Sequence, residues 1–383
     1  NNVAVGGGAL HSNTTASNNT AMGYRSLKAN TTGTANVSVG AYSLDANTTG
    51  SNNTAVGKSS LGVNTTGAGN TALGVETLQA SITANNNTAV GFQALALTTG
   101  NENTAVGRLS MFYTTTGYEN AALGYYSLRS NTTGNKNTAL GVFSMGSNTT
   151  STFNAAVGYN SLYANTTGAQ NTCVGALAGD GITTGEANIC IGFDSGSYQE
   201  SITTGSQNIC LGAYSRTQGT ANQGIAIGYD IGGSSGTTTI GFGTSDIRTT
   251  HGNPNWAGVS DERYKKDITA STAGLSFVNA LRPVTWNYKT LGELPETFNA
   301  YKADSTEVFK NTQTNHGFIA QEVKAAIDAD NSIEDGFQMW NNTRPDGAQE
   351  VAEGALIPVL VKAIQELSTQ NAALEARLTA LEA

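Results

Sequence analysis

The chain has 383 residues, enough for two or three ordinary domains, and carries 19 basic and 28 acidic side chains for a net charge of −9. This charge argues against a nucleic-acid partner, because neutralising phosphates requires clustered Lys and Arg. No apolar run approaches the roughly 20 residues that span a bilayer, so membrane insertion is not expected either.

The composition changes near residue 250. Residues 1–250 hold 8 basic and 10 acidic side chains, whereas residues 251–383 hold 11 and 18. All five prolines and all three tryptophans also lie after residue 250. Two regions of different architecture are therefore expected. The chain begins without Met and without a signal peptide, which we interpret as a fragment of a longer protein.

The first region repeats one motif, "NTAVG" or a close variant. The step between successive motif glycines is 17 residues, with a single step of 16, and it loosens after Gly192. An apolar residue, Leu or Met, stands four positions after most of these glycines, and an "NTTG" turn follows in several repeats. The motif glycines are Gly6, Gly23, Gly40, Gly57, Gly74, Gly91, Gly107, Gly124, Gly141, Gly158, Gly175 and Gly192.

Each repeat predicts a short strand (T-A-V-G), a second short apolar segment (S-L) and an Asn/Thr/Gly turn. The Val, Leu or Ile before the glycine and the Leu after it are the only sizeable apolar groups. A single repeat cannot bury them, but repeats stacked in register can. We therefore expect a mainly β fold, a β-solenoid or β-roll. Its core is thin, so three chains are expected to pack together.

The repeat resembles the head repeats of trimeric autotransporter adhesins and of bacteriophage tail fibres, which carry an "N-[ST]-x-A-[IV]-G" signature. The matching text includes "NNTAMG" (18–23), "NNTAVG" (52–57), "ENTAVG" (102–107) and "KNTALG" (136–141). This resemblance covers roughly residues 1–245 and implies a trimeric, left-handed parallel β-roll.

Three features of this region invite a chemical interpretation. Cys173, Cys190 and Cys210 each lie two positions before a repeat glycine, and we expect them to be small buried residues in a ladder, because they lack the CxxC spacing and nearby His of a zinc site. The "NTT" triplets match the N-glycosylation pattern, but their role in each coil is expected to be turn formation. The glycines form no phosphate-binding motif. No metal and no cofactor are expected.

The second region reads as ordinary globular protein. Residues 272–289 predict an amphipathic helix ended by Pro283 and then a strand with alternating Val284, Trp286 and Tyr288. Residues 316–327 predict a strand or turn that runs into another helix. We expect a shaft at 1–250, a linker at 251–259, an α+β domain at 260–353 and a coiled-coil helix at 354–383.

The expected C-terminal helix has apolar residues at alternating steps of three and four, which is the pattern of a coiled-coil seam with one polar position. The Ile and Leu pattern does not determine how many helices form the coiled coil, and the expected fibre favours three. An ordinary amphipathic helix is the alternative. The expected trimer seam is Ile357, Leu360, Ile364, Leu367, Asn371, Leu374, Leu378 and Leu381.

In this order, the C-terminal motifs resemble the endosialidase-type intramolecular chaperone domain of bacteriophage tail spikes and fibres. The matching text is "SDERYKKDI" (260–268), "GLSFVNALRPVTWNYK" (274–289), "HGFIAQEV" (316–323) and "LIPVLVKAIQEL" (356–367). The resemblance spans essentially all of 260–383. It implies a domain that trimerises, templates the β-fibre before it and then cuts itself off.

The same resemblance implies cleavage between Ser260 and Asp261, with Ser260 as nucleophile and Lys265 as its base. A serine hydroxyl needs a neighbouring base, and a lysine can serve once burial lowers its pKa. Lys266 is the rival base, and Arg263 is assigned a structural role. A Ser-His-Asp triad with His251 or His316 is a weaker alternative.

The expected function is therefore a trimeric viral tail fibre or spike that attaches to a host, with a C-terminal chaperone that acts once, in cis, as an endopeptidase. The expected partners are two further copies of the chain, other virion tail proteins upstream and a host-surface receptor, glycan or protein. The expected location is the virion tail. Alternatives are an adhesin or fibre with a retained, uncleaved chaperone cap, and the shaft of a glycan depolymerase.

Overall fold

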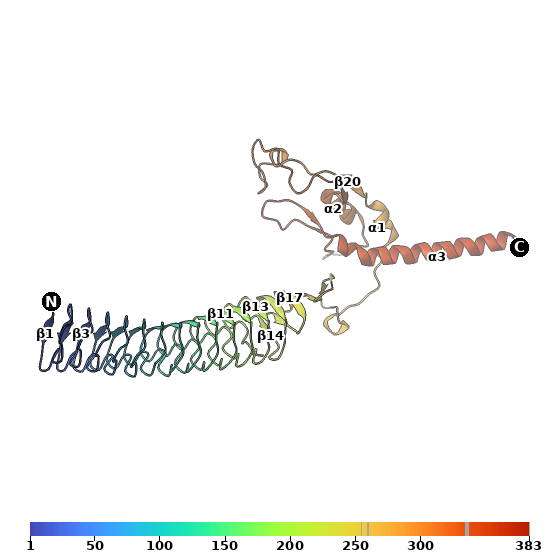
Figure 1. The fold of residues 1–383 in the computed structure, drawn as a ribbon. Helices are drawn as coiled ribbons and strands as arrows, with labels where there is room; N and C mark the ends of the chain where they lie inside the picture. The colour runs from blue at the N-terminus through green and yellow to red at the C-terminus, as the bar shows by residue number, and fades with distance from the viewer. Residues whose placement is uncertain (254, 259, 334–336, 383) are drawn as a thin grey trace. The chain divides into compact units, whose positions relative to one another are not determined.

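A computed structural model describes residues 1–253, 255–258, 260–333 and 337–382 (Figure 1). The chain divides into two compact units, Asn1–Ser260 and Asp261–Ala383. The first unit confirms a mainly β protein built as a β-solenoid of 17-residue coils, and the second is a small domain that contains the helices.

Successive coils of the first unit each contribute one short strand to a parallel ladder. Residues 17 apart pair directly, as in Thr54↔Thr71 and Ala55↔Ala72. The strands of the ladder are β1 (Val3–Val5), β2 (Thr20–Met22), β3 (Val37–Val39), β4 (Thr54–Val56), β5 (Thr71–Leu73), β6 (Thr88–Val90), β7 (Thr104–Val106), β8 (Ala121–Leu123), β9 (Thr138–Leu140), β10 (Ala155–Val157), β11 (Thr172–Val174), β12 (Ile189–Ile191) and β13 (Ile209–Leu211).

The ladder ends in longer strands and an antiparallel hairpin. β15 (Ile225–Tyr229) continues the parallel pairing from β13 to β17 (Thr237–Phe242). β17 then pairs antiparallel with β18 (Ser245–Thr250), which pairs with β19 (Ala257–Gly258). β14 (Arg216–Thr217) and β16 (Gly232–Gly233) form a separate parallel pair. The second expected apolar segment of each repeat (S-L) is a turn, so only T-A-V is a strand.

The repeat glycine marks a corner that requires glycine. Gly40 has a φ of +129°, and a Cβ at this position would lie 2.6 Å from the carbonyl oxygen of Gly57 in the next coil. The corner continues through left-handed residues, of which Leu44 has a φ of 48°. That backbone is unfavourable for leucine by roughly 1–2 kcal/mol, and the complete burial of the side chain offsets it.

The core of each coil corrects one expectation from the sequence. The Leu four positions after the glycine is buried as expected: Leu61 has an exposure of 0%. The apolar residue directly before the glycine, however, faces outward: Leu73 is 46% exposed and Leu123 is 51% exposed. Side chains alternate along a strand, and here the central residue, such as Ala72, points into the coil. Stacking therefore buries the alanine of the strand and leaves its larger neighbour outside.

The rest of the coil interior contains buried asparagines that recur at the same positions in successive coils. The asparagine of each "NTTG" turn is buried, and Asn47 donates from Nδ2 to the carbonyl of Gly50 (2.9 Å) and to Oδ1 of Asn30 (2.9 Å). This confirms the turn role of these triplets. A second buried ladder starts each strand: Asn53 Oδ1 accepts from the backbone N–H of Asn70 (3.0 Å) one coil on.

The three cysteines form the expected buried ladder. Cys173, Cys190 and Cys210 lie in register on β11, β12 and β13, and all three are free thiols. In two of the three cysteine coils, the position that holds leucine in other coils is glycine: Gly179 follows Cys173 and Gly196 follows Cys190. The larger thiol therefore occupies part of the space that the leucine fills in other coils.

We expect Gly179→Ala to destabilise the solenoid by about 1–3 kcal/mol, because it overpacks the core at a φ of +61° and places a methyl group 2.5 Å from Cys173 Sγ. Combining it with Cys173→Ala removes the sulfur and should recover part of the loss. Urea unfolding of the two single variants and the double variant measures the coupling. Strictly additive losses would show that the two positions do not share one space.

The second unit contains the helices. They are α1 (Leu275–Ala280), α2 (Ala320–Ala329) and α3 (Ile357–Glu382), with short 3-10 segments η1 (Glu262–Tyr264), η2 (Leu291–Glu293) and η3 (Glu353–Leu356). β20 (Val284–Trp286) pairs antiparallel with β21 (Asn315–Gly317), and β22 (Trp340–Asn341) with β23 (Glu350–Val351). These bounds match the expected order, although α1 is shorter than the sequence pattern and β20 ends before Tyr288.

The core of this unit joins segments far apart in the chain. Phe277 of α1, Val323 of α2, Met339, Leu356 and Val359 are buried together. At the start of α1, the backbone N–H of Leu275 donates to a carboxylate oxygen of Glu366 on α3 (2.8 Å). The first turns of α3 are therefore fixed to the globular part.

The expected coiled-coil seam lies on a different face of α3 from the buried one. Val359 and Ala363 are 4% and 3% exposed, whereas Ile364 is 64% and Leu381 is 83% exposed. The other seam residues, Ile357, Leu360, Leu367, Asn371, Leu374 and Leu378, are also exposed. Among the described helices, none is both long and apolar enough to cross a membrane.

Candidate functional site

The charged run that follows Ser260 forms a compact turn. Asp261 precedes η1, and its Oδ1 accepts a hydrogen bond from the backbone N–H of Arg263 (2.9 Å). The Arg263 guanidinium donates from Nε to Oδ1 (2.9 Å) and from Nη2 to Oδ2 (2.6 Å) of the same carboxylate. This two-pronged pair holds the side chain of Asp261 against the turn and lowers the pKa of Asp261.

The predicted nucleophile and base flank this turn. Ser260 is exposed and closes the first unit, while Lys265 is exposed and ends η1, with its backbone N–H donating to the carbonyl of Glu262 (2.9 Å). Asp261 and Arg263 lie between these two residues in the sequence. The pairing of Ser260 with Lys265 stays a prediction, as does the choice between Lys265 and Lys266. The structural role assigned to Arg263 fits its contacts with Asp261.

The two histidines of the alternative triad have local contacts. His251 Nε2 lies 3.2 Å from Thr238 Oγ1 across the end of the β17–β18 hairpin. His316 lies in β21 opposite Thr285 of β20. His316 thus lies within a strand pair, whereas His251 lies in the turn that follows β18.

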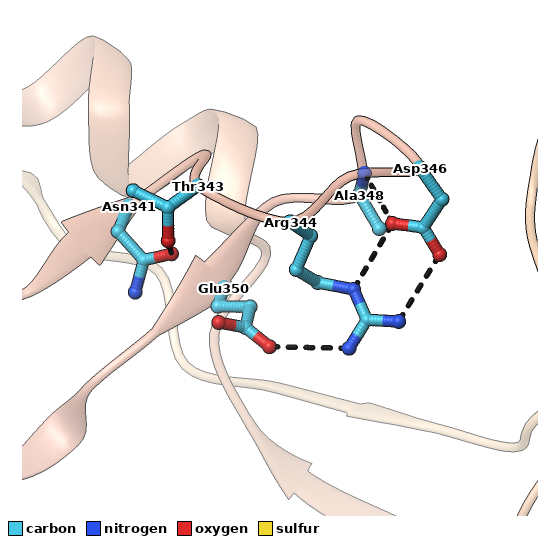
Figure 2. Close-up of polar contacts among 6 residues, drawn as sticks. All are labelled: Asn341, Thr343, Arg344, Asp346, Ala348 and Glu350. Atoms are coloured by element: carbon cyan, nitrogen blue, oxygen red, sulfur yellow. Dashed lines mark hydrogen bonds and ion pairs between the residues drawn. The ribbon is translucent and has the colours of Figure 1, made fainter.

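A polar network that the sequence reading missed organises the loop between β22 and β23 (Figure 2). Arg344 donates to both carboxylate oxygens of Asp346 (3.1 Å each) and to Glu350 Oε1 (3.3 Å). Asp346 also accepts from the backbone N–H of Ala348 (3.2 Å). The hydrogen bonds from Arg344 lower the pKa of Asp346 to about 2. The turn sequence Pro345-Asp346-Gly347 was the available signal.

This network borders a cavity of about 730 Å³ in the second unit. Its walls include Trp286, Tyr288, Phe298 and Phe309, and Arg344 and Glu350 reach it from the loop. Aromatic walls with a few charged groups are typical of sites that accept another molecule or another chain segment.

Comparison with known proteins gives a family match for part of the second unit. Residues 260–331 match the family described as chaperone of endosialidase. The match begins at Ser260 and includes the motifs at 260–268, 274–289 and 316–323, while the motif at 356–367 lies beyond it. No curated protein matches the chain. No solved structure matches it either. The chain thus joins a β-solenoid to a C-terminal segment that is similar to the chaperone of endosialidase family.

Proposed function

We propose that this chain is the shaft of a trimeric viral tail fibre or spike with a C-terminal chaperone that assembles three copies and then removes itself by cleavage between Ser260 and Asp261. The mature shaft would belong to the virion tail and attach to the host. The observation that carries the proposal is a pair of uncovered apolar surfaces, one on each unit, beside the match to the chaperone family.

The first surface runs along the solenoid, and we name it the outer stripe. It consists of exposed apolar residues three or one positions before the repeat glycine, or one after it. Its members are Val3, Val5, Met22, Tyr24, Val37, Leu73, Val75, Phe92, Leu123, Leu140, Val142, Val157, Tyr159, Val174, Ile189, Ile191, Phe193, Tyr229, Ile240 and Phe242. Exposed apolar surface of this extent is typical of an interface.

The partner best suited to the outer stripe is another copy of the same chain. The stripe recurs at the same positions in most coils of the ladder, so a surface that covers it needs the same period. The second surface, the exposed seam of α3, has the pattern of a helix that pairs with its own copies. Both surfaces therefore support self-association, and the likeness to fibre repeats favours three chains.

A removable chaperone has a clear physical use in such a protein. Parallel pairing among separate chains involves contacts far apart in sequence and is slow, and the unpaired edges can aggregate meanwhile. Helix α3 forms from local contacts and can bring three chains into register first. Once the rods have formed, the barrier to unfolding retains them and the chaperone is no longer needed.

The cleavage chemistry follows from the residues at the junction. Acting as the general base, the amine of Lys265 takes the hydroxyl proton of Ser260, and the oxygen attacks the carbonyl carbon of a Ser260–Asp261 bond. The Asp261 amine leaves with the proton from Lys265, and water hydrolyses the acyl intermediate. Attack by Ser260 on its own carbonyl closes a strained lactone ring, so the hydroxyl of one copy would attack the bond of another copy in the trimer, which departs from the cleavage in cis expected from the sequence. Cleavage then depends on assembly.

The test is the intact mass of the purified chain. We expect the wild-type chain to yield two fragments split between Ser260 and Asp261, and Ser260→Ala and Lys265→Ala to stay whole because the hydroxyl or its base is missing. Lys266→Ala is the matched control and should still be cut. A wild-type chain that forms trimers and stays whole would mean that the domain is a permanent cap.

A further inference from the structure

A line of aromatic side chains with an arginine in it crosses four successive coils of the shaft. The guanidinium of Arg129 lies over the rings of Tyr113 (5.3 Å) and Tyr126 (4.6 Å). The ring of Tyr126 contacts Phe143 at 5.4 Å, and Phe143 contacts Tyr163 at 6.3 Å. We name these five residues the aromatic–arginine cluster.

The cluster borders the outer stripe at Phe143, whose ring lies 6.5 Å from that of Tyr159, and it is held firmly. All five residues lie in turns outside the strands. Tyr126 and Phe143 occupy left-handed corner positions, with φ of 59° each, so their backbones are fixed by the coil. The ring of Tyr163 covers Gly146, where an added Cβ would lie 2.8 Å from the ring. Tyr113 and Tyr163 are nevertheless 42% and 40% exposed.

The charge of the cluster is unusual within the shaft. Arg25, Arg216 and Arg248 each form an ion pair with an aspartate. Within the described part of the chain, Arg108 and Arg129 form no such pair with a carboxylate. The Nε of Arg129 is buried and lacks a hydrogen-bond partner there. A cation without a carboxylate, framed by tyrosines, is suited to an anionic group brought by a ligand.

We propose that the aromatic–arginine cluster binds an anionic glycan. The C–H faces of the sugar rings would pack on the exposed rings of Tyr113 and Tyr163, and a sugar carboxylate would pair with Arg129. Tyrosine hydroxyls at the exposed rings can bond sugar hydroxyls. A peptide partner does not present a repeating series of rings that could stack on a continuous line of aromatic side chains along the rod. This inference deepens the proposed host attachment by naming the class of receptor.

The experiment measures binding of oligogalacturonate, which has a carboxylate on each sugar ring, by isothermal titration calorimetry. A neutral maltooligosaccharide of equal length is the comparison ligand. We expect the acidic oligomer to bind, the neutral one to bind far more weakly, and added salt to weaken binding of the acidic one. Arg129→Gln should reduce affinity about tenfold or more, since it removes a charged hydrogen bond.

The matched control is Arg25→Gln. Arg25 also lies over a tyrosine ring, that of Tyr42 at 5.5 Å, but Asp45 already neutralises it. This variant should bind as the wild type does. Tyr163→Ala is the second test, because its exposed ring contributes stacking without charge, and it should weaken the acidic oligomer severalfold. Circular dichroism of each variant checks that the solenoid is folded.

Three results would overturn the inference: no binding of oligogalacturonate, equal affinity for the neutral oligomer, or equal losses in Arg129→Gln and Arg25→Gln. Capture of a protein ligand that ignores Arg129 would also do so. The mass and oligomeric state of the same preparations test the proposed function separately. Because the whole cluster lies on one chain, its binding can be measured on chains that are not cut and do not form trimers.

Discussion

Replacing Asn53 by alanine is expected to lower the free energy of unfolding of the solenoid by about 2–4 kcal/mol. Its Nδ2 donates to the carbonyl of Gly67 (2.8 Å), and its Oδ1 accepts from the backbone N–H of Asn70 (3.0 Å). Alanine leaves the buried N–H of Asn70 without a partner, at about 1–3 kcal/mol, and removes one of the two hydrogen bonds to the Gly67 carbonyl, which still accepts from Asn64 Nδ2 (3.0 Å). The side chain is fully buried, so water cannot replace it without entering the coil.

Asn52→Gly is the control for this variant. Asn52 is the exposed neighbour of Asn53, and its φ of 60° suits glycine, so the change removes an asparagine side chain without strain. Urea unfolding followed by circular dichroism compares the two. In a solenoid each coil contacts only its neighbours, so we expect Asn53→Ala to broaden the transition as well as weaken it. A loss below 1 kcal/mol would mean that the asparagine ladder is not a main source of stability.

The sequence predicts the coil period and half of the coil interior. The glycine step and the Leu after it follow from spacing alone, because a corner that excludes a side chain and a position that must be apolar leave strong marks. The inward role of Ala72 and the outward role of Leu73 do not follow, since hydropathy ranks them in the opposite order. A thin coil has room only for a small inward residue, so the size of the side chain rather than its hydrophobicity decides which residue of the strand points inward.

Buried asparagines mislead for a related reason. Asn47 and Asn53 look like surface turn residues, yet each is fully buried. Stacking supplies partners one coil away for many of the polar atoms that the turn leaves over, as the bond from Asn47 to Asn30 illustrates. Asparagine side chains can be buried here with their hydrogen bonds kept because identical turns repeat in register. The composition of one repeat does not reveal this.

For the candidate site, the sequence predicted its position in the chain but not the contacts of its side chains. The resemblance of "SDERYKKDI" located the junction, and the family match begins at the same serine. Short sequence separation between Ser260 and Lys265 does not fix the distance between their side chains, and burial of a lysine depends on what covers it. The ion pair of Arg344 with Asp346 and Glu350 escaped prediction because charged residues in a loop have many possible partners.

Placing aspartate at two seam positions of α3, Ile364→Asp with Leu367→Asp, is expected to abolish trimers and prevent cleavage. The two side chains are 64% and 44% exposed in the single chain, so the change leaves the core of the domain intact. In a trimer each lost side chain forfeits about 1.5–3 kcal/mol of burial, and the added carboxylates repel one another. The control is Gln370→Asp, an exposed position outside the seam.

This prediction distinguishes a seam that is needed only to start assembly from one that also holds the finished fibre together. If the seam is needed only to start assembly, the double variant should yield whole monomers or aggregates, while wild-type rods separated from their cleaved chaperone should remain trimers. Analytical ultracentrifugation and intact mass on both samples measure this. Trimers of the double variant would assign assembly to the outer stripe alone. Wild-type rods that dissociate once the chaperone has left would show that α3 holds the fibre together rather than only building it.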